Sequence, residues 1–184
     1  MTAMRHRPVL ALVAAAALAA GCLGAQVKAT SFCATQGGQV VPGTPAGGSV
    51  QTQVLLDLGG LGSDLDQSGV TGTVLIQSFT ISTDDPAVDL YGVTSLGLEA
   101  TATDPASALP PVPLACDYQR PAGAAPPLRS VTATCSGPNL FEYVKAKTLA
   151  LDVVLSGAGL PAAPWPASMG SCLSVQVDVD YTAL

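Results

Sequence analysis

Histidine is almost missing from this chain of 184 residues, because the only one, His6, lies close to the N-terminus. Histidine is the commonest general base near neutral pH and the commonest ligand of transition metals in proteins. Beyond residue 6 the sequence therefore excludes Ser-His-Asp and Cys-His catalysis. It also lacks Gly-x-Ser-x-Gly, P-loop and Cys-x-x-Cys motifs. We therefore expect a protein that is not an enzyme and carries no cofactor and no metal.

Basic residues are scarce as well. Seven lysines and arginines stand against 13 aspartates and glutamates, which leaves a formal net charge of −6. Binding to nucleic acid depends on neutralising phosphates, so this balance excludes a nucleic-acid partner. It also excludes a polybasic attachment to anionic lipid. Disorder is not expected, because 48% of the residues are hydrophobic.

The sequence has no apolar run long enough to span a bilayer. The longest, Val9 to Ala20, holds 12 residues, whereas a membrane-spanning helix needs about 20. Arg5, His6 and Arg7 precede this run, and small residues follow it. A positive start, a short apolar core and small residues are typical of a signal peptide. We therefore assign residues 1–21 to a signal peptide that is removed.

The end of this segment carries a recognisable motif. Leu18-Ala19-Ala20-Gly21-Cys22 resembles the lipobox of bacterial lipoproteins, with Ala19 rather than leucine at position −3. The resemblance implies that Cys22 is diacylated, becomes the new N-terminus and holds the protein at a membrane. Leu23, in place of aspartate, implies the outer membrane of a Gram-negative bacterium, by resemblance to the sorting rule of enteric bacteria. Ordinary signal-peptidase cleavage before Cys22, with simple secretion, is the alternative.

The cysteine count agrees with an anchor at Cys22. Without it, four of the five cysteines remain, an even number of the kind expected where thiols pair in an oxidising compartment. Four cysteines allow three connectivities. We favour Cys116–Cys135, which flank a loop rich in proline and glycine, together with Cys33–Cys172, which would join the first strand to the last.

The anchor and the cysteines suggest a division of the chain. Residues 22–30 are expected to form a short lipid-anchored tether, and residues 31–184 a single domain. Ten residues separate Cys22 from Cys33, a reach of at most about 36 Å. We therefore expect the domain to lie close to its membrane.

Alternation with a period of two dominates this domain. Near the C-terminus, Val175, Val177 and Val179 alternate with polar residues, which places the two sets on opposite faces of a sheet. Clusters of glycine, proline and aspartate separate such segments. The pattern predicts an all-β fold, an antiparallel β-sandwich of about seven strands with long Pro/Gly-rich loops. The expected strands cover 27–34, 50–58, 71–82, 95–102, 129–135, 148–155 and 174–181.

At most one or two short helices are expected. The first candidate covers residues 139–145, where Asn139 could cap the helix start. The second is a turn near residues 63–68. Gly59-Gly60-Leu61-Gly62 precedes it but lacks the context of a phosphate-binding loop.

Two groups of acidic residues could carry chemistry. Asp64, Asp66 and Ser68 are spaced like the start of a calcium loop, but Leu75 stands where the bidentate glutamate would be expected, so an acidic turn is favoured. Asp178 and Asp180 share one face of a strand, and Asp152 could lie nearby. Paired carboxylates could serve a glycoside hydrolase, although a solvated face that protects an edge explains them more simply.

Trp165 stands between two prolines, which predicts a rigid loop. An exposed tryptophan there could anchor a partner, but we expect it to cover the core. The leading hypothesis is a lipid-anchored extracytoplasmic domain with a non-catalytic binding or envelope-structural role, whose partner would be a protein or a polysaccharide. The alternatives are a carboxylate-based hydrolase acting on envelope glycan and a calcium-dependent adhesin.

Overall fold

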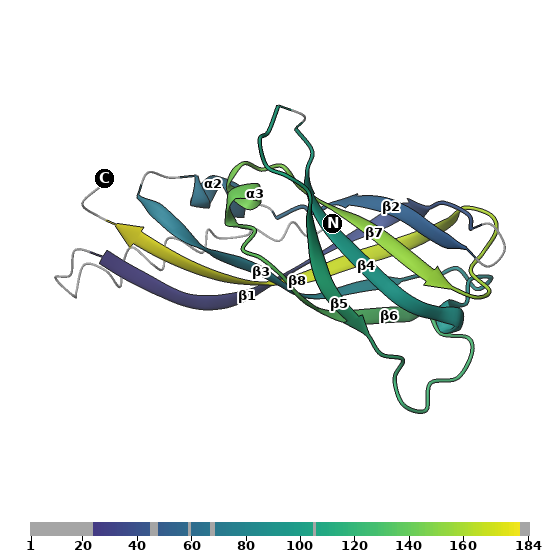
Figure 1. Cartoon of the computed structure of the whole chain (residues 1–184). Coiled ribbons are helices and arrows are strands. Elements are labelled where there is room, and N and C mark those ends of the chain that lie inside the picture. The colour runs from purple at the N-terminus through teal and green to yellow at the C-terminus, as the bar shows by residue number, and fades with distance from the viewer. Residues whose placement is uncertain (1–23, 45–47, 59, 67–68, 105, 181–184) are drawn as a thin grey trace, which may run out of the picture.

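The computed structural model describes residues 24–44, 48–58, 60–66, 69–104 and 106–180 (Figure 1). Within these ranges the prediction of an antiparallel all-β fold is confirmed, with two short α-helices, α2 and α3, and one 3-10 turn, η1. The elements in chain order are β1 Gly24–Val41, β2 Ser49–Leu55, α2 Leu61–Leu65, β3 Val70–Ser82, η1 Leu90–Gly92, β4 Val93–Ala102, β5 Val112–Tyr118, β6 Ser130–Ser136, α3 Phe141–Lys145, β7 Leu149–Gly157 and β8 Trp165–Asp180.

The eight described strands form one continuous sheet in the order β1-β8-β3-β6-β5-β4-β7-β2. β5 bends this sheet into two layers, because it changes partner halfway along its length. Its first residues pair with β4, as in Leu114 opposite Leu98, and its last residues pair with β6, as in Ala115 opposite Ser136. Strands that switch sheets in this way make the corners of sandwiches. We call β1, β8, β3 and β6 layer one, and β4, β7 and β2 layer two.

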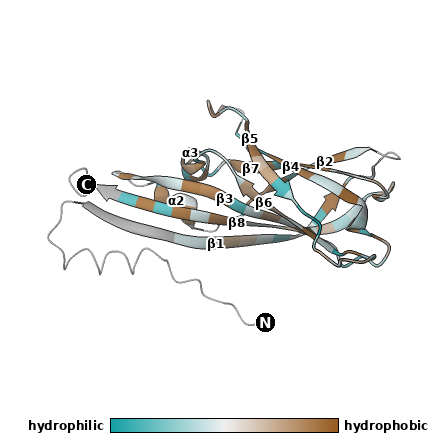
Figure 2. Cartoon of the chain, turned by 60° about the horizontal axis from the view of Figure 1, so that its bottom comes forward, coloured by the Kyte–Doolittle hydropathy of each residue, from teal (hydrophilic) through white to brown (hydrophobic). Residues whose placement is uncertain are grey.

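The core lies between the layers and follows the alternation of the sequence. Along β6 every second residue is buried, and Figure 2 shows hydrophobic and hydrophilic bands alternating along β8. Layer one contributes Phe79, Ile81 and Leu173, and layer two contributes Leu151 and Leu155, all of them fully buried. Burial of each such side chain stabilises the fold by about 1.5–3 kcal/mol before the entropy of ordering is subtracted.

Layer one extends well beyond layer two. β1, β3 and β8 hold 18, 13 and 16 residues, whereas β2, β7 and β4 hold 7, 9 and 10. On this extension α2 and α3 take the place of layer two, as Figure 1 shows. A β-carbon on Gly72 of β3 would lie 2.2 Å from the Gln176 carbonyl oxygen of β8 and 3.2 Å from the Phe141 ring of α3, so only glycine fits between the neighbouring strand and that ring. The far end of the extension, where β1 and β3 begin and β8 ends, is called the tip below.

Asn139 joins α3 to the part of β3 that has a neighbouring strand, β8, on one side only. β6 pairs only with residues 78–82 of β3, so the earlier backbone groups of β3 need other partners. The Asn139 Oδ1 accepts the N–H of Val74 at 2.8 Å and the N–H of Phe141 at 3.0 Å. Its Nδ2 donates to the Gly72 carbonyl at 2.8 Å. The prediction that Asn139 caps the helix was wrong by one position, because α3 begins at Phe141 and Leu140 is its N-cap residue. Asn139 lies just before the N-cap, where it accepts the first N–H of the helix and also completes the edge of β3.

Three features differ from the sequence-based predictions. The sheet has eight strands rather than about seven, because β5 follows a proline cluster that was interpreted as a turn. β8 begins at Trp165 rather than near residue 174. Residues 24–30, which were assigned to a tether, belong to β1 and pair with the end of β8, with Gly24 opposite Asp180 and Thr30 opposite Val175. The backbone of these residues finds hydrogen-bond partners in β8, so the strand begins directly after the anchor motif.

Candidate functional site

Four of the five cysteines form two disulfides, in the two pairs that the sequence favoured. Cys33–Cys172 joins β1 to β8, and Cys116–Cys135 joins β5 to β6. Each bridge links residues that lie directly opposite each other on neighbouring antiparallel strands. The first lies at the surface, where Cys33 is exposed, and the second packs into the core, where Cys135 is 7% exposed. The two disulfides indicate an oxidising, extracytoplasmic compartment.

The fifth cysteine, Cys22, and the motif around it lie outside the described residues. The description begins at Gly24, two positions later and already inside β1. Among the described residues, no helix is long and apolar enough to cross a membrane.

Asp152 and Asp178, which were expected to lie near each other, belong to different layers. Asp152 belongs to β7 in layer two and accepts a hydrogen bond from the Gln53 Nε2 at 2.9 Å. Asp178 belongs to β8 in layer one, opposite Thr71 of β3. The side chain of Asp180 lies outside the described residues. The structure instead places Glu99 of β4 directly opposite Asp152.

The sequence did not predict the Glu99–Asp152 pair, because the alternation of residues shows only that each of the two lies on a solvent-exposed face of its strand. Its formation depends on β4 and β7 becoming neighbours in a particular register. Like charges directly opposite on neighbouring strands destabilise a sheet. Both residues are half-exposed on the outer face of layer two, so this arrangement is that of a solvated surface.

The acidic segment that resembled a calcium loop lies at the end of α2. Asp66 is exposed and follows the last residue of that helix. The side chain of Asp64 and the whole of Ser68 lie outside the described residues. In the described part of the chain, no group of three or more histidine, cysteine, aspartate or glutamate residues could hold a metal ion.

Trp165 is 2% exposed and lies at the start of β8, opposite Val41. The expectation that it covers the core is therefore confirmed. An anchor for a partner would have to be exposed, so Trp165 does not serve as one.

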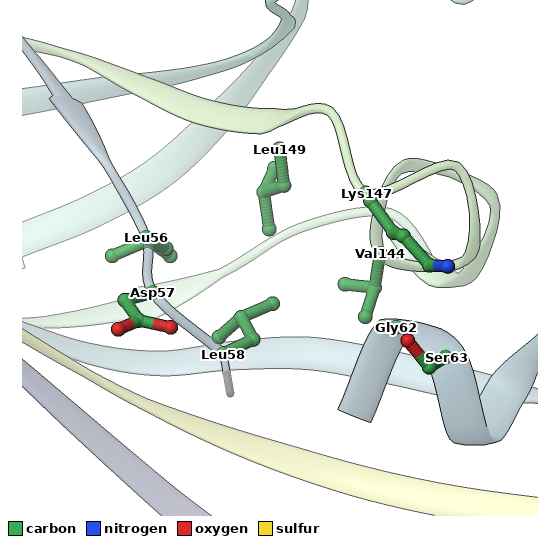
Figure 3. A pocket seen from close by; sticks show the side chains of 8 residues that line it. All are labelled: Leu56, Asp57, Leu58, Gly62, Ser63, Val144, Lys147 and Leu149. Atoms are coloured by element: carbon green, nitrogen blue, oxygen red, sulfur yellow. The ribbon is translucent and has the colours of Figure 1, made fainter. Parts of the chain in front are cut away.

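A small cavity of about 210 Å³ lies between the end of β2, the two helices and the start of β7 (Figure 3). Leu58, Val144 and Leu149 point towards its centre, whereas the Asp57 carboxylate points away from it. Ligand pockets usually measure about 300–1,000 Å³. At this size and with this lining, the cavity is a packing gap between the helices and layer two.

The close packing of α2 on α3 explains two residues around this gap. A β-carbon on Gly62 would lie 2.7 Å from the Val144 carbonyl oxygen, so only glycine fits there. Lys147, just beyond α3, has a φ of 59°, a left-handed conformation more usual for glycine at a helix end. Gly62, the last glycine of the glycine-rich segment, therefore has a structural explanation.

The best-organised polar groups lie at the other end of the molecule, in segments 42–44, 83–92, 119–129 and 158–164. We call these four segments the loop end. Asp89 lies at its centre, where its Oδ1 accepts the N–H of Tyr91 at 2.9 Å and the N–H of Leu128 at 2.8 Å. These two backbone hydrogen bonds hold the pKa of the Asp89 carboxyl below its usual range. One carboxylate thereby joins two loops that are 39 residues apart in sequence.

Arg129 strengthens the same connection from the opposite side. Its guanidinium donates to the backbone carbonyls of Asp85, at 2.9 Å, of Pro86, at 3.0 Å, and of Val88. The guanidinium of Arg120 stacks over the Tyr91 ring, 4.1 Å from its centroid. Such cation–π contacts contribute about 0.5–1 kcal/mol at exposed sites.

The other two loops join this unit through their backbones. The Thr44 N–H donates to the Pro161 carbonyl at 2.8 Å, and the Ala158 N–H donates to the Gly92 carbonyl at 3.0 Å. A β-carbon on Gly43 would lie 1.9 Å from the Ala162 carbonyl oxygen, so the loops also touch closely. The loop end is thus a surface of exposed loops held by hydrogen bonds, the arrangement in which binding residues are most often presented.

Replacing Asp89 with asparagine is expected to lower the melting temperature at pH 7, because a neutral amide oxygen is a weaker acceptor than a carboxylate. The folded-state pKa of Asp89 is lowered, so its contribution is present above the ordinary aspartate pKa of about 3.9 and is lost as the pH falls further. The difference in melting temperature between wild type and Asp89→Asn should therefore shrink between pH 5 and pH 2. Asp84→Asn, an exposed change on the same loop, is the control for charge. An equal difference at pH 7 and at pH 2 would contradict the assignment.

Comparison of the chain with protein-family models, with curated proteins and with solved structures found no match.

Proposed function

We propose that this protein is a lipoprotein of the cell envelope, anchored by lipid on Cys22, with a non-catalytic binding or structural role. The observation that carries the proposal is the pairing of the other four cysteines, because it leaves Cys22 as the one cysteine without a disulfide partner in the chain. Attachment of a diacylglyceryl group to that thiol would account for the fifth cysteine. The outer membrane of a Gram-negative bacterium is the proposed location.

The binding role rests on the contrast between the two ends of the domain. The packing gap near α2, of about 210 Å³, is smaller than a usual ligand pocket. The loop end presents exposed main chain and polar side chains on a hydrogen-bonded frame. We therefore propose that the loop end contacts another envelope protein or a polysaccharide.

The anchor is tested with Cys22→Ala in the full chain, expressed in a Gram-negative host. The variant is expected to move from the membrane fraction to the soluble fraction, because the acyl chains that hold the protein are lost. It should contain no free thiol, and the mass of the wild-type N-terminus should show the lipid. Cys116→Ala/Cys135→Ala is the matched control, since it also removes cysteine but should remain in the membrane. Retention of Cys22→Ala in the membrane, or a free thiol in it, would refute the proposal.

The binding role is tested by cross-linking in native membranes with a tagged, Cys22-anchored protein. A partner protein or glycan should be enriched with the wild type and not with Arg129→Ala. This variant removes the hydrogen bonds from Arg129 to the carbonyls of segment 83–92. The folded state of that variant is checked by its circular dichroism. Equal recovery from both forms would count against the loop end as the binding surface.

A further inference from the structure

The position of β1 relative to Cys22 decides how the domain stands on a membrane. Gly24 is already paired with Asp180, so only Leu23 lies between the anchor and the sheet. The two residue steps from Cys22 to Gly24 span at most about 7 Å. The tether of nine residues expected from the sequence would have allowed the domain to turn freely, whereas this connection holds one end of the sheet at the membrane surface.

The tip and the loop end lie at opposite ends of the molecule. β1 runs from the tip to Val41 beside the loop end, and β8 returns from Trp165 to the tip. Figures 1 and 2 show these two strands side by side along the whole length of the domain. The 18 residues of β1, at about 3.3 Å each, span about 60 Å before bulges and curvature shorten the distance.

The connection between tip and body is stiff. β1 is an edge strand, but it pairs with β8 over most of its length and is fastened to it by Cys33–Cys172. β8 is held on its other side by β3, from Val70 to Ser82. The inner face of the extension is covered by α2 and α3, where Leu65 and Phe141 are 1% and 4% exposed. The tip and the two-layered body are therefore expected to keep a fixed orientation relative to each other.

We infer that the tip is the membrane-facing end of the protein and that the loop end faces away from the bilayer, about 50–60 Å above it. This inference rests on the proposed lipid anchor at Cys22. The tip contacts a lipid surface. A macromolecule that binds the loop end would bind at that height above the bilayer and not in the headgroup region. The domain thus reaches outward from the membrane, although its nearest residues lie against it.

The orientation is measured by energy transfer in vesicles of phosphatidylethanolamine and phosphatidylglycerol that carry a headgroup acceptor dye. The lipidated protein is labelled through a single non-natural amino acid at Thr71, near the tip, or at Ala122, in the loop end, both of which are exposed. Transfer from position 71 is expected to be several-fold more efficient than transfer from position 122. Equal transfer from both, or stronger transfer from 122, would overturn the inference.

A matched control distinguishes the effect of the short connection on orientation from the effect of the lipid anchor on membrane binding. Insertion of a Gly/Ser segment of about 12 residues between Leu23 and Gly24 gives a flexible tether with a root-mean-square reach of roughly 20 Å. The difference between the two positions should then become much smaller. Flotation distinguishes the two proposals: protein that does not float with the vesicles defeats the anchor and the orientation together. Protein that floats without a difference between the positions defeats the orientation alone.

Discussion

Removal of the Cys33–Cys172 bridge is expected to lower the free energy of unfolding by about 5 kcal/mol, and removal of Cys116–Cys135 by about 3 kcal/mol. The two bridges connect residues 139 and 19 positions apart. A cross-link across a longer loop removes more conformational entropy from the unfolded chain, so the first bridge should contribute more. It also fastens an edge strand, whereas the second joins two strands that each have another neighbour.

The comparison is made with the double alanine variants of each pair in a Cys22→Ala background, which removes the proposed lipid attachment site and leaves no unpaired thiol. Urea unfolding followed by circular dichroism gives the free energies. Hydrogen exchange should show the loss of protection concentrated in β1 when its bridge is absent. A larger loss from the Cys116–Cys135 variant would contradict the argument from loop length.

Asn139→Ala is expected to destabilise the protein by about 2–4 kcal/mol, a large effect for an exposed residue. Three hydrogen bonds are lost together, and a net contribution of about 0.5–1.5 kcal/mol is usual for each. The change removes the hydrogen-bond partner of the Val74 N–H and of the Gly72 carbonyl. Both groups lie in the part of β3 that does not pair with β6. The same measurement by urea unfolding applies.

Asn139→Asp is the matched control, because it keeps an acceptor for Val74 and Phe141 and loses only the donor to Gly72. Its loss of stability should be smaller than that of Asn139→Ala. Equal losses from the two variants would show that Asn139 acts only as a donor and would remove its role as the acceptor for Val74 and Phe141.

The β-strands could be predicted to very different degrees. The sequences of β7 and of the second half of β8 place a large apolar residue at every second position, so both strands were predicted from the sequence. The first half of β8 alternates equally well in burial, but its inward residues include Ala167 and Ser171, whose small side chains give no hydropathy signal. β5 was hidden by Pro111 and Pro113. Proline is tolerated there because the strand pairs with β4 over only three residues before it changes layer.

The polar groups of the loop end could not have been found from the sequence. Asp89 and Leu128 are 39 residues apart, and Arg129 contacts carbonyls 41 to 44 residues away. None of these residues forms part of a motif, and an aspartate near a loop turn predicts only a local hydrogen bond. The packing of β3 against β6 brings the two loops together, and that contact is not local.

The sequence by itself determined the class of fold, the compartment and the cysteine that stands apart from the others. These properties follow from local alternation, from composition and from counting, which need no knowledge of neighbours in space. The tertiary structure decided that the described chain enters the sheet at Gly24 and that β5 turns the corner between the layers. It also decided that the four segments of the loop end gather far from the tip. Each of these depends on which backbone groups find partners in distant segments. A local pattern shows which face of a strand is buried, but it does not show which other strand pairs with it or packs against that face.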